Sequence, residues 1–322
     1  MNLKKIAVIA TVAVIVLAAF IYVYYSTNTS ASQSEEGIII TDAQGYQTTL
    51  PAVPQRIISL APSVTPILYQ IGVGDKVVGL TEYDNYPYNF TAWYETGNMT
   101  CVGGFSTPNM EAIATVDPDV IFTTNINDQY IPNMRELGYK VIVVGPTSIQ
   151  GVYDTINLIG KATGAETGAA TLVDSLQSQI SSITDKVATA GITEKPNVYY
   201  EVWYDSSGVM AAGGGSWIND VITTAGGVNV FGNETSEFPS SSSEVVVKEN
   251  PDVILIPKNM GDYHGSVDDI KARPGWNAIN AVKNDRIYII DEDVFNQAGI
   301  RIADQVQAVA ESLYPNLFNS SS

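Results

Sequence analysis

The sequence has 322 residues, enough for two lobes that each bury a core of their own. Its 34 acidic residues outnumber 16 basic ones, and the resulting charge of −18 repels nucleic acid, so the composition excludes a nucleic-acid partner. Only one cysteine, Cys101, and one histidine, His264, are present, which excludes an internal disulfide framework and direct capture of a bare transition metal. We expect His264 to lie solvated in an exposed loop.

An uncharged apolar run at residues 6–25 follows two lysines and is long enough to cross a bilayer as a helix. We interpret residues 1–25 as a retained membrane anchor and residues 26–36, which are rich in Ser, Thr, Asn and Gln, as a flexible linker. No cysteine follows the run, so any tether is the helix itself. The chain is therefore predicted at the extracytoplasmic face of the membrane, or secreted if it is cleaved near residue 32.

The folded part is predicted to begin near Gly37, with α/β lobes at residues 37–148 and 191–322 and bridging helices at 149–190. The pattern of residues 37–50 predicts a hairpin. After it, β-rich runs alternate with segments of helical character, which indicates mainly parallel sheets with crossover helices. The predicted strands cover residues 56–60, 76–81, 119–124, 140–145, 197–203, 252–257 and 286–291, and the predicted helices cover 65–71, 109–115, 218–225 and 303–313.

A long helix is predicted in the middle of the chain. Its apolar residues recur at steps of three and four with no strand signal between them, which predicts one buried stripe on a helix of about 25 residues, or roughly 37 Å. A coiled coil is the alternative, but the stripe lasts only about two heptads. We favour a helix that lies across both lobes. The stripe comprises Val173, Leu176, Ile180, Ile183 and Val187.

The two halves of the chain share a spaced pattern, Phe-x5-Glu-x6-Pro-Asp-Val-Ile. It begins at Phe105 in the first half and at Phe238 in the second, and its glutamates are Glu111 and Glu244. In each copy an aromatic lies in a loop, a glutamate opens a short helix, and a Pro-Asp turn ends that helix before a buried strand. The alternative is that each glutamate only stabilises its helix start and each phenylalanine packs in a core.

Aromatic side chains at equivalent places predict a ligand cleft between the lobes. Phe105 and Phe238 are candidates for opposite walls, and Trp217 adds wall area. Two further pairs follow the carboxyl ends of predicted strands, where open α/β sheets place ligands. These pairs are Tyr83 with Asp84 and Tyr204 with Asp205.

Several stretches, taken in order, resemble the helical-backbone (class III) substrate-binding proteins of ABC importers for cobalamin and iron complexes, closest to the cobalamin-binding branch. The resemblance runs from about Gly37 to Pro315. The matching stretches include RIISLAPSVTPILYQIGVGDKVVGLTEYDNYP at 56–87, VGGFSTPNMEAIATVDPDVI at 102–121, AAGGGSWINDVITTAGGVNVF at 211–231, SSEVVVKENPDVIL at 242–255 and AVKNDRIYIID at 281–291.

The resemblance implies two Rossmann-like lobes bridged by a long helix, with a ligand in the cleft. We expect the protein to act as a monomer. The resemblance also implies that Glu111 and Glu244 dock onto arginines of the ABC permease that works with its ATPase. Tyr83 looks like a tyrosine of the aromatic cluster that clasps the corrin, and Arg301 resembles a polar contact of some iron-complex binders. Phe105 and Phe238 stand where the cobalamin branch tends to have tryptophan.

Other functions remain as alternatives. Ferric-siderophore or haem binding fits the same fold, whereas a chelatase-like enzyme would need a catalytic histidine with acidic partners, and a surface adhesin has no reason to repeat one glutamate per lobe. We expect no catalytic residue, no bound metal site and no cofactor, and a metal carried inside its own chelate as the transported ligand. Gly213, Gly214 and Gly215 could form an anion-binding turn, but a plain tight turn is favoured.

Overall fold

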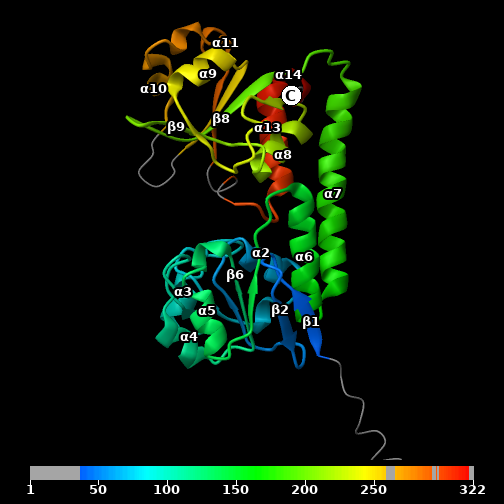
Figure 1. Ribbon diagram of the computed structural model, residues 1–322. Coiled ribbons are helices and arrows are strands. Elements are labelled where there is room, and N and C mark those ends of the chain that lie inside the picture. Colours follow the sequence, from blue (N-terminus) through cyan, green and yellow to red (C-terminus); the bar gives the residue numbers. More distant parts are fainter. Residues whose placement is uncertain (1–36, 259–264, 292–294, 296, 319–322) are drawn as a thin grey trace, which may run out of the picture. The chain divides into compact units, whose positions relative to one another are not determined.

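The computed structural model describes residues 37–258, 265–291, 295 and 297–318 (Figure 1). The expected anchor and linker, residues 1–36, and His264 lie outside this described part. Among the described residues, no helix has the length and apolar character needed to span a bilayer.

The first lobe contains a five-stranded sheet in which every pairing is parallel. Its central strands are buried on both faces, as expected for a sheet covered by crossover helices (Figure 1). In spatial order the strands are β5 (Thr100–Cys101), β4 (Val77–Leu80), β3 (Ile57–Ser59), β6 (Val120–Thr123) and β7 (Val141–Val143), and the helices are α2 (Val64–Gln70), α3 (Thr91–Glu95), α4 (Met110–Val116) and α5 (Ile131–Glu136).

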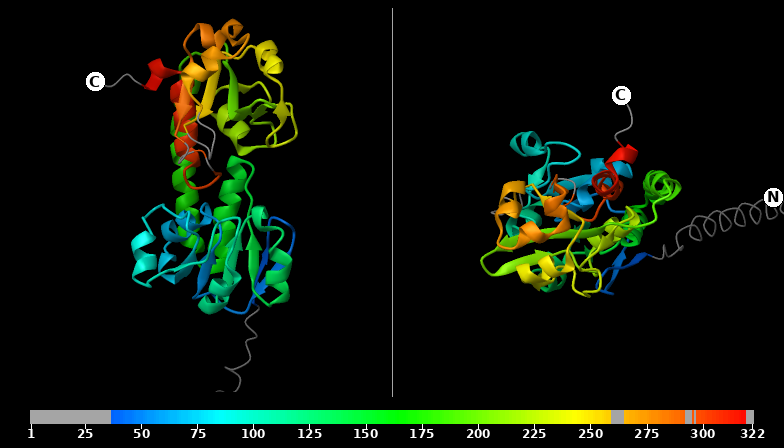
Figure 2. Two further views of the ribbon diagram at one scale, coloured as in Figure 1. Left: turned by 90° about the vertical axis from the view of Figure 1, so that its left-hand side faces the viewer. Right: turned by 90° about the horizontal axis from the view of Figure 1, so that it is seen from above.

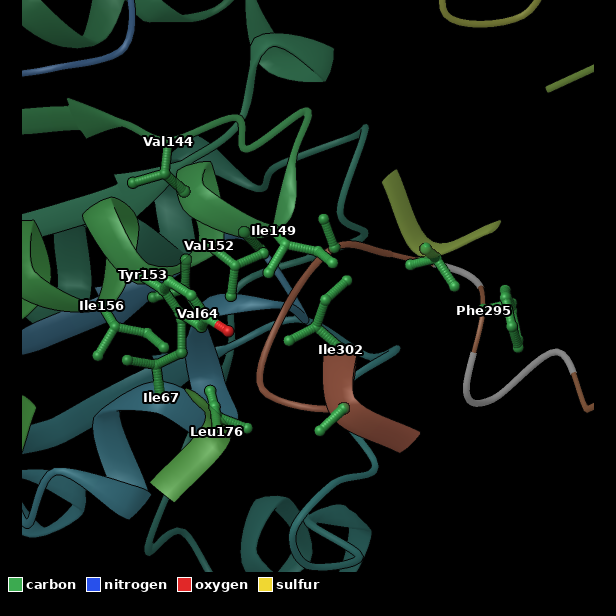
Figure 3. Packing of buried hydrophobic residues seen from close by; sticks show 14 of the residues in the cluster. Val64, Ile67, Val144, Ile149, Val152, Tyr153, Ile156, Leu176, Phe295 and Ile302 are labelled. Atoms are coloured by element: carbon green, nitrogen blue, oxygen red, sulfur yellow. The ribbon is translucent and has the colours of Figure 1, made fainter. Parts of the chain in front are cut away.

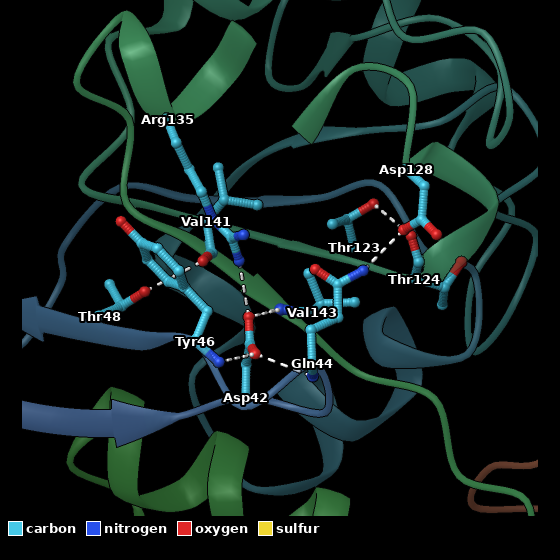
Figure 4. Close-up of polar contacts among 10 residues, drawn as sticks. All are labelled: Asp42, Gln44, Tyr46, Thr48, Thr123, Thr124, Asp128, Arg135, Val141 and Val143. Atoms are coloured by element: carbon cyan, nitrogen blue, oxygen red, sulfur yellow. Dashed lines mark hydrogen bonds and ion pairs between the residues drawn. The ribbon is translucent and has the colours of Figure 1, made fainter. Parts of the chain in front are cut away.

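An antiparallel hairpin, β1 (Ile38–Thr41) with β2 (Gln47–Leu50), docks on β7 through a buried carboxylate (Figure 4). Asp42 Oδ1 accepts hydrogen bonds from the backbone N–H groups of Gln44 and Tyr46, each at 2.9 Å. Asp42 Oδ2 accepts from the backbone N–H of Val143 at 3.2 Å and pairs with Arg135 at 2.8 Å. Since the Asp42 side chain is fully buried and its contacts join the turn to β7 and to α5, the hairpin is an integral part of the first lobe.

The second lobe repeats the parallel core of the first and adds antiparallel strands. The order β10-β8-β12-β13 matches β4-β3-β6-β7, and all of these pairs are parallel. The predicted strand at 197–203 continues to Asp205, because it turns into a hairpin with β9. The strands are β8 (Asn197–Asp205), β9 (Gly208–Ala211), β10 (Val228–Asn229), β11 (Ser240–Ser241), β12 (Val253–Pro257) and β13 (Ile287–Ile290). The helices are α8 (Trp217–Thr224), α9 (Ser243–Glu249), α10 (Val267–Ala272), α11 (Asn280–Lys283), α13 (Ile302–Leu313) and α14 (Pro315–Phe318).

The sheets are connected by two helices, α6 (Ile149–Thr163) and α7 (Glu166–Thr189). The predicted long helix is confirmed: α7 has 24 residues, and four of the five residues predicted for its stripe are buried, while Val187 is partly buried. It packs against α6 and against α13, and Figure 2 shows it running beside elements of both sheets. Gly164, left-handed at φ 68°, ends α6 and lets the chain reverse into α7.

One apolar cluster continues from the first lobe through these helices into the second. Figure 3 shows Val64 and Ile67 of α2, Val152 of α6 and Ile302 of α13 facing a common interior, and all four side chains are buried. Burying a side chain of this size stabilises the fold by about 1.5–3 kcal/mol. Contacts within this cluster therefore stabilise the arrangement of α13 on α6 and α2.

Candidate functional site

The internal repeat is confirmed as two matching helices. α4 and α9 each have 7 residues and carry a glutamate in the first turn, Glu111 and Glu244. Each ends in a left-handed residue, Asp117 at φ 50° and Asn250 at φ 46°, just before the Pro-Asp pair that leads into a buried strand. Asp and Asn tolerate this conformation better than other residues with a side chain, so the local sequence explains both helix ends.

The aspartates of the two Pro-Asp pairs have equivalent roles. Asp119 Oδ2 accepts hydrogen bonds from the backbone N–H groups of Gln55 at 2.7 Å and Arg56 at 2.9 Å, just before β3. Asp252 Oδ2 accepts from the backbone N–H of Asn197 at 3.0 Å, at the start of β8. In both lobes the carboxylate fixes the start of the neighbouring central strand, and so fixes the helix with its glutamate relative to the sheet.

Both glutamates are exposed. The pKa of Glu244 is lowered by a side-chain hydrogen bond from Ser242 and by its own backbone N–H. Its carboxylate therefore keeps its negative charge to a lower pH than an ordinary glutamate. An anion at the first turn of a helix is also favoured by the helix dipole.

The repeated phenylalanines each meet a second aromatic ring edge-on. Phe105 lies 5.1 Å from Tyr83, centroid to centroid, at an interplanar angle of 81°. Phe238 lies 5.8 Å from Trp217 at 82°. Such T-shaped pairs are a favoured aromatic geometry. Tyr83 is 55% exposed, while the other three rings are partly buried, so each pair has accessible surface.

A buried amide supports Phe105, and sequence reasoning missed it. Asn127 is fully buried and donates from Nδ2 to the backbone carbonyl of Phe105 at 2.8 Å and to Thr123 Oγ1 at 2.9 Å. Gly103, at φ 96°, turns the chain just before Phe105, and a Cβ there would overlap the Thr107 carbonyl. The contact between Asn127 and Phe105 is non-local, so no local signal marked the asparagine.

Asp84, which we predicted as a ligand contact beside Tyr83, has an internal role in the structure. Its carboxylate is buried, and Oδ2 accepts from the Thr81 backbone N–H at 2.8 Å and from Thr81 Oγ1 at 2.7 Å. Desolvation by burial raises the pKa of Asp84. These contacts fix the turn that carries Tyr83 rather than presenting the carboxylate on the surface.

Tyr204 lies within β8, not past its end, and it covers a buried ion pair. The Arg273 guanidinium lies 3.5 Å from the Tyr204 ring centroid and donates to both carboxylate oxygens of Glu201, at 2.5 and 2.8 Å. Both charged side chains are almost completely buried. The partly buried Tyr204 ring therefore packs on this ion pair in the second lobe, and the structure does not bring it to the Phe238 pair. Glu201 and Arg273 are far apart in sequence, so no spacing pattern predicted their pairing.

Arg301 precedes α13 and contacts both lobes. Its Nε lies 3.4 Å from Asp304 Oδ2, and its guanidinium lies 5.7 Å from the ring centroid of Tyr86 in the first lobe. A cation over an aromatic face within this distance is attracted to it. Within the part of the chain that the structure describes, no group of three or more His, Cys, Asp or Glu side chains is arranged to hold a metal ion.

A family model, described as periplasmic binding protein, matches residues 57–294. The chain belongs to the periplasmic binding protein family. A curated relative from Bacillus subtilis, the uncharacterized ABC transporter substrate-binding lipoprotein YvrC, is 31% identical over 87% of each chain. The cobalamin-binding protein of Halobacterium salinarum is 31% identical over 66% of this chain and 57% of its own length.

Solved structures of this family share the fold. A periplasmic solute-binding protein from Staphylococcus epidermidis matches 82% of this chain and 100% of its own with a TM-score of 0.70 at 29% identity. Structures of a vitamin B12-binding protein from Vibrio cholerae and a haem-binding protein from Roseiflexus match at 23% and 22% identity, which shows the fold alone. The predicted two-lobed α/β architecture with mainly parallel sheets is thereby confirmed.

Proposed function

We propose that this protein is the extracytoplasmic solute-binding component of an ABC importer, which captures cobalamin or a similar metal chelate between its lobes and delivers it to the permease. One observation carries the proposal. Each lobe holds an edge-to-face aromatic pair at the phenylalanine of the repeat, Tyr83 with Phe105 and Trp217 with Phe238. Two apolar walls of this kind suit a large, flat guest such as a corrin or a porphyrin.

The metal is proposed to arrive already chelated. The described residues offer no cluster of metal-ligating side chains, and transition metals are usually held by several His or Cys ligands. The cobalamin-binding relative from Halobacterium salinarum supports a corrinoid as the first choice of guest. Haem and ferric siderophores are the alternatives, and haem is supported by the haem-binding protein of similar fold.

Glu111 and Glu244 are the proposed docking residues for the permease. Both are exposed at the first turn of a matching helix, one on each lobe, and Glu244 keeps its charge because Ser242 donates to it. Paired carboxylates can each accept a bidentate arginine, which gives orientation as well as affinity. We propose further that the protein acts as a monomer, held at the outer face of the membrane by residues 1–25.

Calorimetric titration of the purified full chain tests the ligand. Cyanocobalamin, haemin and a ferric hydroxamate are titrated in parallel, with free Co²⁺ and Fe³⁺ as controls. We expect one chelate to bind with a Kd of about 1 μM or tighter and to be recovered chemically unchanged, and the free metals not to bind. Binding of a free metal in place of every chelate, or conversion of a chelate to a new product, would contradict the proposal.

A further inference from the structure

The loop that carries Phe238 rests on a turn of three glycines, Gly213, Gly214 and Gly215. We propose that this turn, named here the glycine seat, is a positioning element that holds the Phe238 and Trp217 pair ready for the ligand. The inference rests on the proposed function, because the proposed function makes the aromatic pair a wall of the ligand cleft. It assigns the glycines no direct contact with the ligand.

Backbone hydrogen bonds fasten the loop, residues 232–239, to the seat at several points. The N–H of Gly213 donates to the carbonyl of Glu237 and the N–H of Gly214 donates to the carbonyl of Glu234, both at 2.8 Å. The N–H of Ala211 donates to the carbonyl of Pro239 at 3.0 Å. The residues on either side of Phe238 are therefore both held by the strand and turn beneath them.

Only glycine fits at these positions. A Cβ built on Gly213, Gly214 or Gly215 would lie less than 3.0 Å from a backbone carbonyl of the loop, a distance that real Cβ atoms essentially never show. The atoms met are the carbonyl oxygens of Ser236, Gly232 and Thr235. Backbone atoms cannot rotate away as a side chain can, so any side chain on the seat must lift the loop.

The same turn fixes the second ring of the pair. Ser216 Oγ donates to the carbonyl of Gly213 at 2.8 Å and accepts from the N–H of Asn219 at 3.4 Å, so it closes the seat and caps α8. Trp217 is the first residue of α8 and follows directly. Both members of the aromatic pair are thus set by one short turn.

The hydrogen bonds of the seat favour a tight turn over an anion-binding turn, the two interpretations of the glycines from the sequence. The N–H groups of Gly213 and Gly214 point to loop carbonyls, so they are not available to cradle an anion. The first lobe lacks this device. Ser63 stands at the start of α2 as Ser216 stands at the start of α8, but the residues before Ser63 are Leu60, Ala61 and Pro62. In that lobe Asn127 supports Phe105 instead.

A double-mutant cycle tests the proposal, with cyanocobalamin as the probe and the full chain as the protein. We expect Gly214→Ala to weaken cyanocobalamin binding about tenfold. In this variant the loop that carries Phe238 is displaced, and part of the binding free energy is used to order it. If Gly214 acts through Phe238, the double variant Gly214→Ala with Phe238→Ala binds no more weakly than Phe238→Ala alone. The control is Gly145→Ala, since a Cβ on Gly145 meets nothing within 4 Å.

Amide hydrogen exchange gives a readout that needs no ligand. We expect Gly214→Ala to speed exchange in residues 232–239, and Gly145→Ala to leave it unchanged. Unchanged exchange, or losses of affinity that add fully in the double variant, would overturn the proposal. If Gly214→Ala does not fold, Ser216→Ala replaces it. We expect Ser216→Ala to speed amide exchange in residues 232–239 to a smaller extent, and unchanged exchange in this variant would overturn the inference. If Phe238→Ala has no effect on binding, or the wild type does not bind the probe, the ligand wall fails, and the exchange result alone decides the role of the seat.

Discussion

Asp220 Oδ2 accepts a hydrogen bond at 3.1 Å from the backbone N–H of Ile149, which joins α8 of the second lobe to the first turn of α6. The first N–H groups of a helix have no partner within it, and here the acceptor comes from α8 of the second lobe. We expect Asp220→Ala to lower the free energy of unfolding by about 1 kcal/mol, measured by urea denaturation. Asp154→Ala, which removes an exposed carboxylate of α6, is the control and should have almost no effect. Equal losses in the two variants would contradict a stabilising role for the contact between α8 and α6.

Reversing the charge of both repeat glutamates should separate capture from delivery. We expect Glu111→Lys with Glu244→Lys to abolish uptake of the ligand by cells and to leave the Kd for cyanocobalamin unchanged, because both carboxylates lie on exposed first turns. Glu95→Lys with Glu249→Lys makes the same change in net charge at other exposed sites and should preserve uptake. Loss of ligand binding in the first variant would show that the glutamates face the ligand instead.

Removing the repeated rings should weaken capture without unfolding the lobes. We expect Phe105→Ala and Phe238→Ala each to raise the Kd for cyanocobalamin about tenfold, because each loses one ring of an edge-to-face pair. Phe105→Trp and Phe238→Trp keep an aromatic wall and should bind within a few-fold of wild type. Calorimetry measures the affinity and thermal unfolding checks the fold. An unchanged Kd in both alanine variants would count against the walls.

The buried ion pair of the second lobe should matter for stability rather than for binding. We expect Arg273→Ala to lower the free energy of unfolding by about 3–5 kcal/mol, because it leaves the Glu201 carboxylate buried without its guanidinium. Lys271→Ala breaks the exposed pair with Asp285 nearby and should cost at most about 1 kcal/mol. Denaturant titration compares the two variants. Similar small losses would show that water reaches Glu201.

Asp84 should give the stability a dependence on pH. Burial raises its pKa in the folded protein above the ordinary value near 3.9, so its favourable contribution is complete at lower pH and is lost as pH rises through the folded pKa. Asparagine cannot ionise. As the pH rises through the folded pKa of Asp84, we therefore expect the free energy of unfolding of Asp84→Asn to increase relative to that of the wild type. Urea unfolding across a pH series measures the difference, and a difference that stays constant with pH would contradict the assignment.

The regular elements could be predicted because their signals are local. The strands at 57–59, 120–123 and 253–257 are short apolar runs after turn residues, and the structure has them within one or two residues of the prediction. α7 could be predicted because its apolar residues recur at helical spacing. The repeat predicted the matching helices because Phe, Glu and Pro-Asp keep the same order and spacing in both lobes.

The supports of the site were missed because they are contacts between distant segments. Asn127 and Phe105, Glu201 and Arg273, and the glycine seat with its loop each join residues whose neighbours in sequence give no sign of the partner. The burial of Asp84 could not be predicted for the same reason, since its sequence position only places it after a strand, and the three-dimensional turn buries it. The end of β8 was misplaced because its hairpin partner, β9, was not predicted.

The hairpin on β7 has a consequence for behaviour at high local concentration. A bare outer strand offers its free N–H and C=O groups to any similar chain, which is how sheets of separate molecules fuse. In β7 three of those groups are already taken: the N–H of Val143 donates to Asp42, its carbonyl accepts from Ala43, and the carbonyl of Val141 accepts from Thr48. The hairpin therefore protects this edge against strand pairing between copies of the protein that are crowded together on one surface.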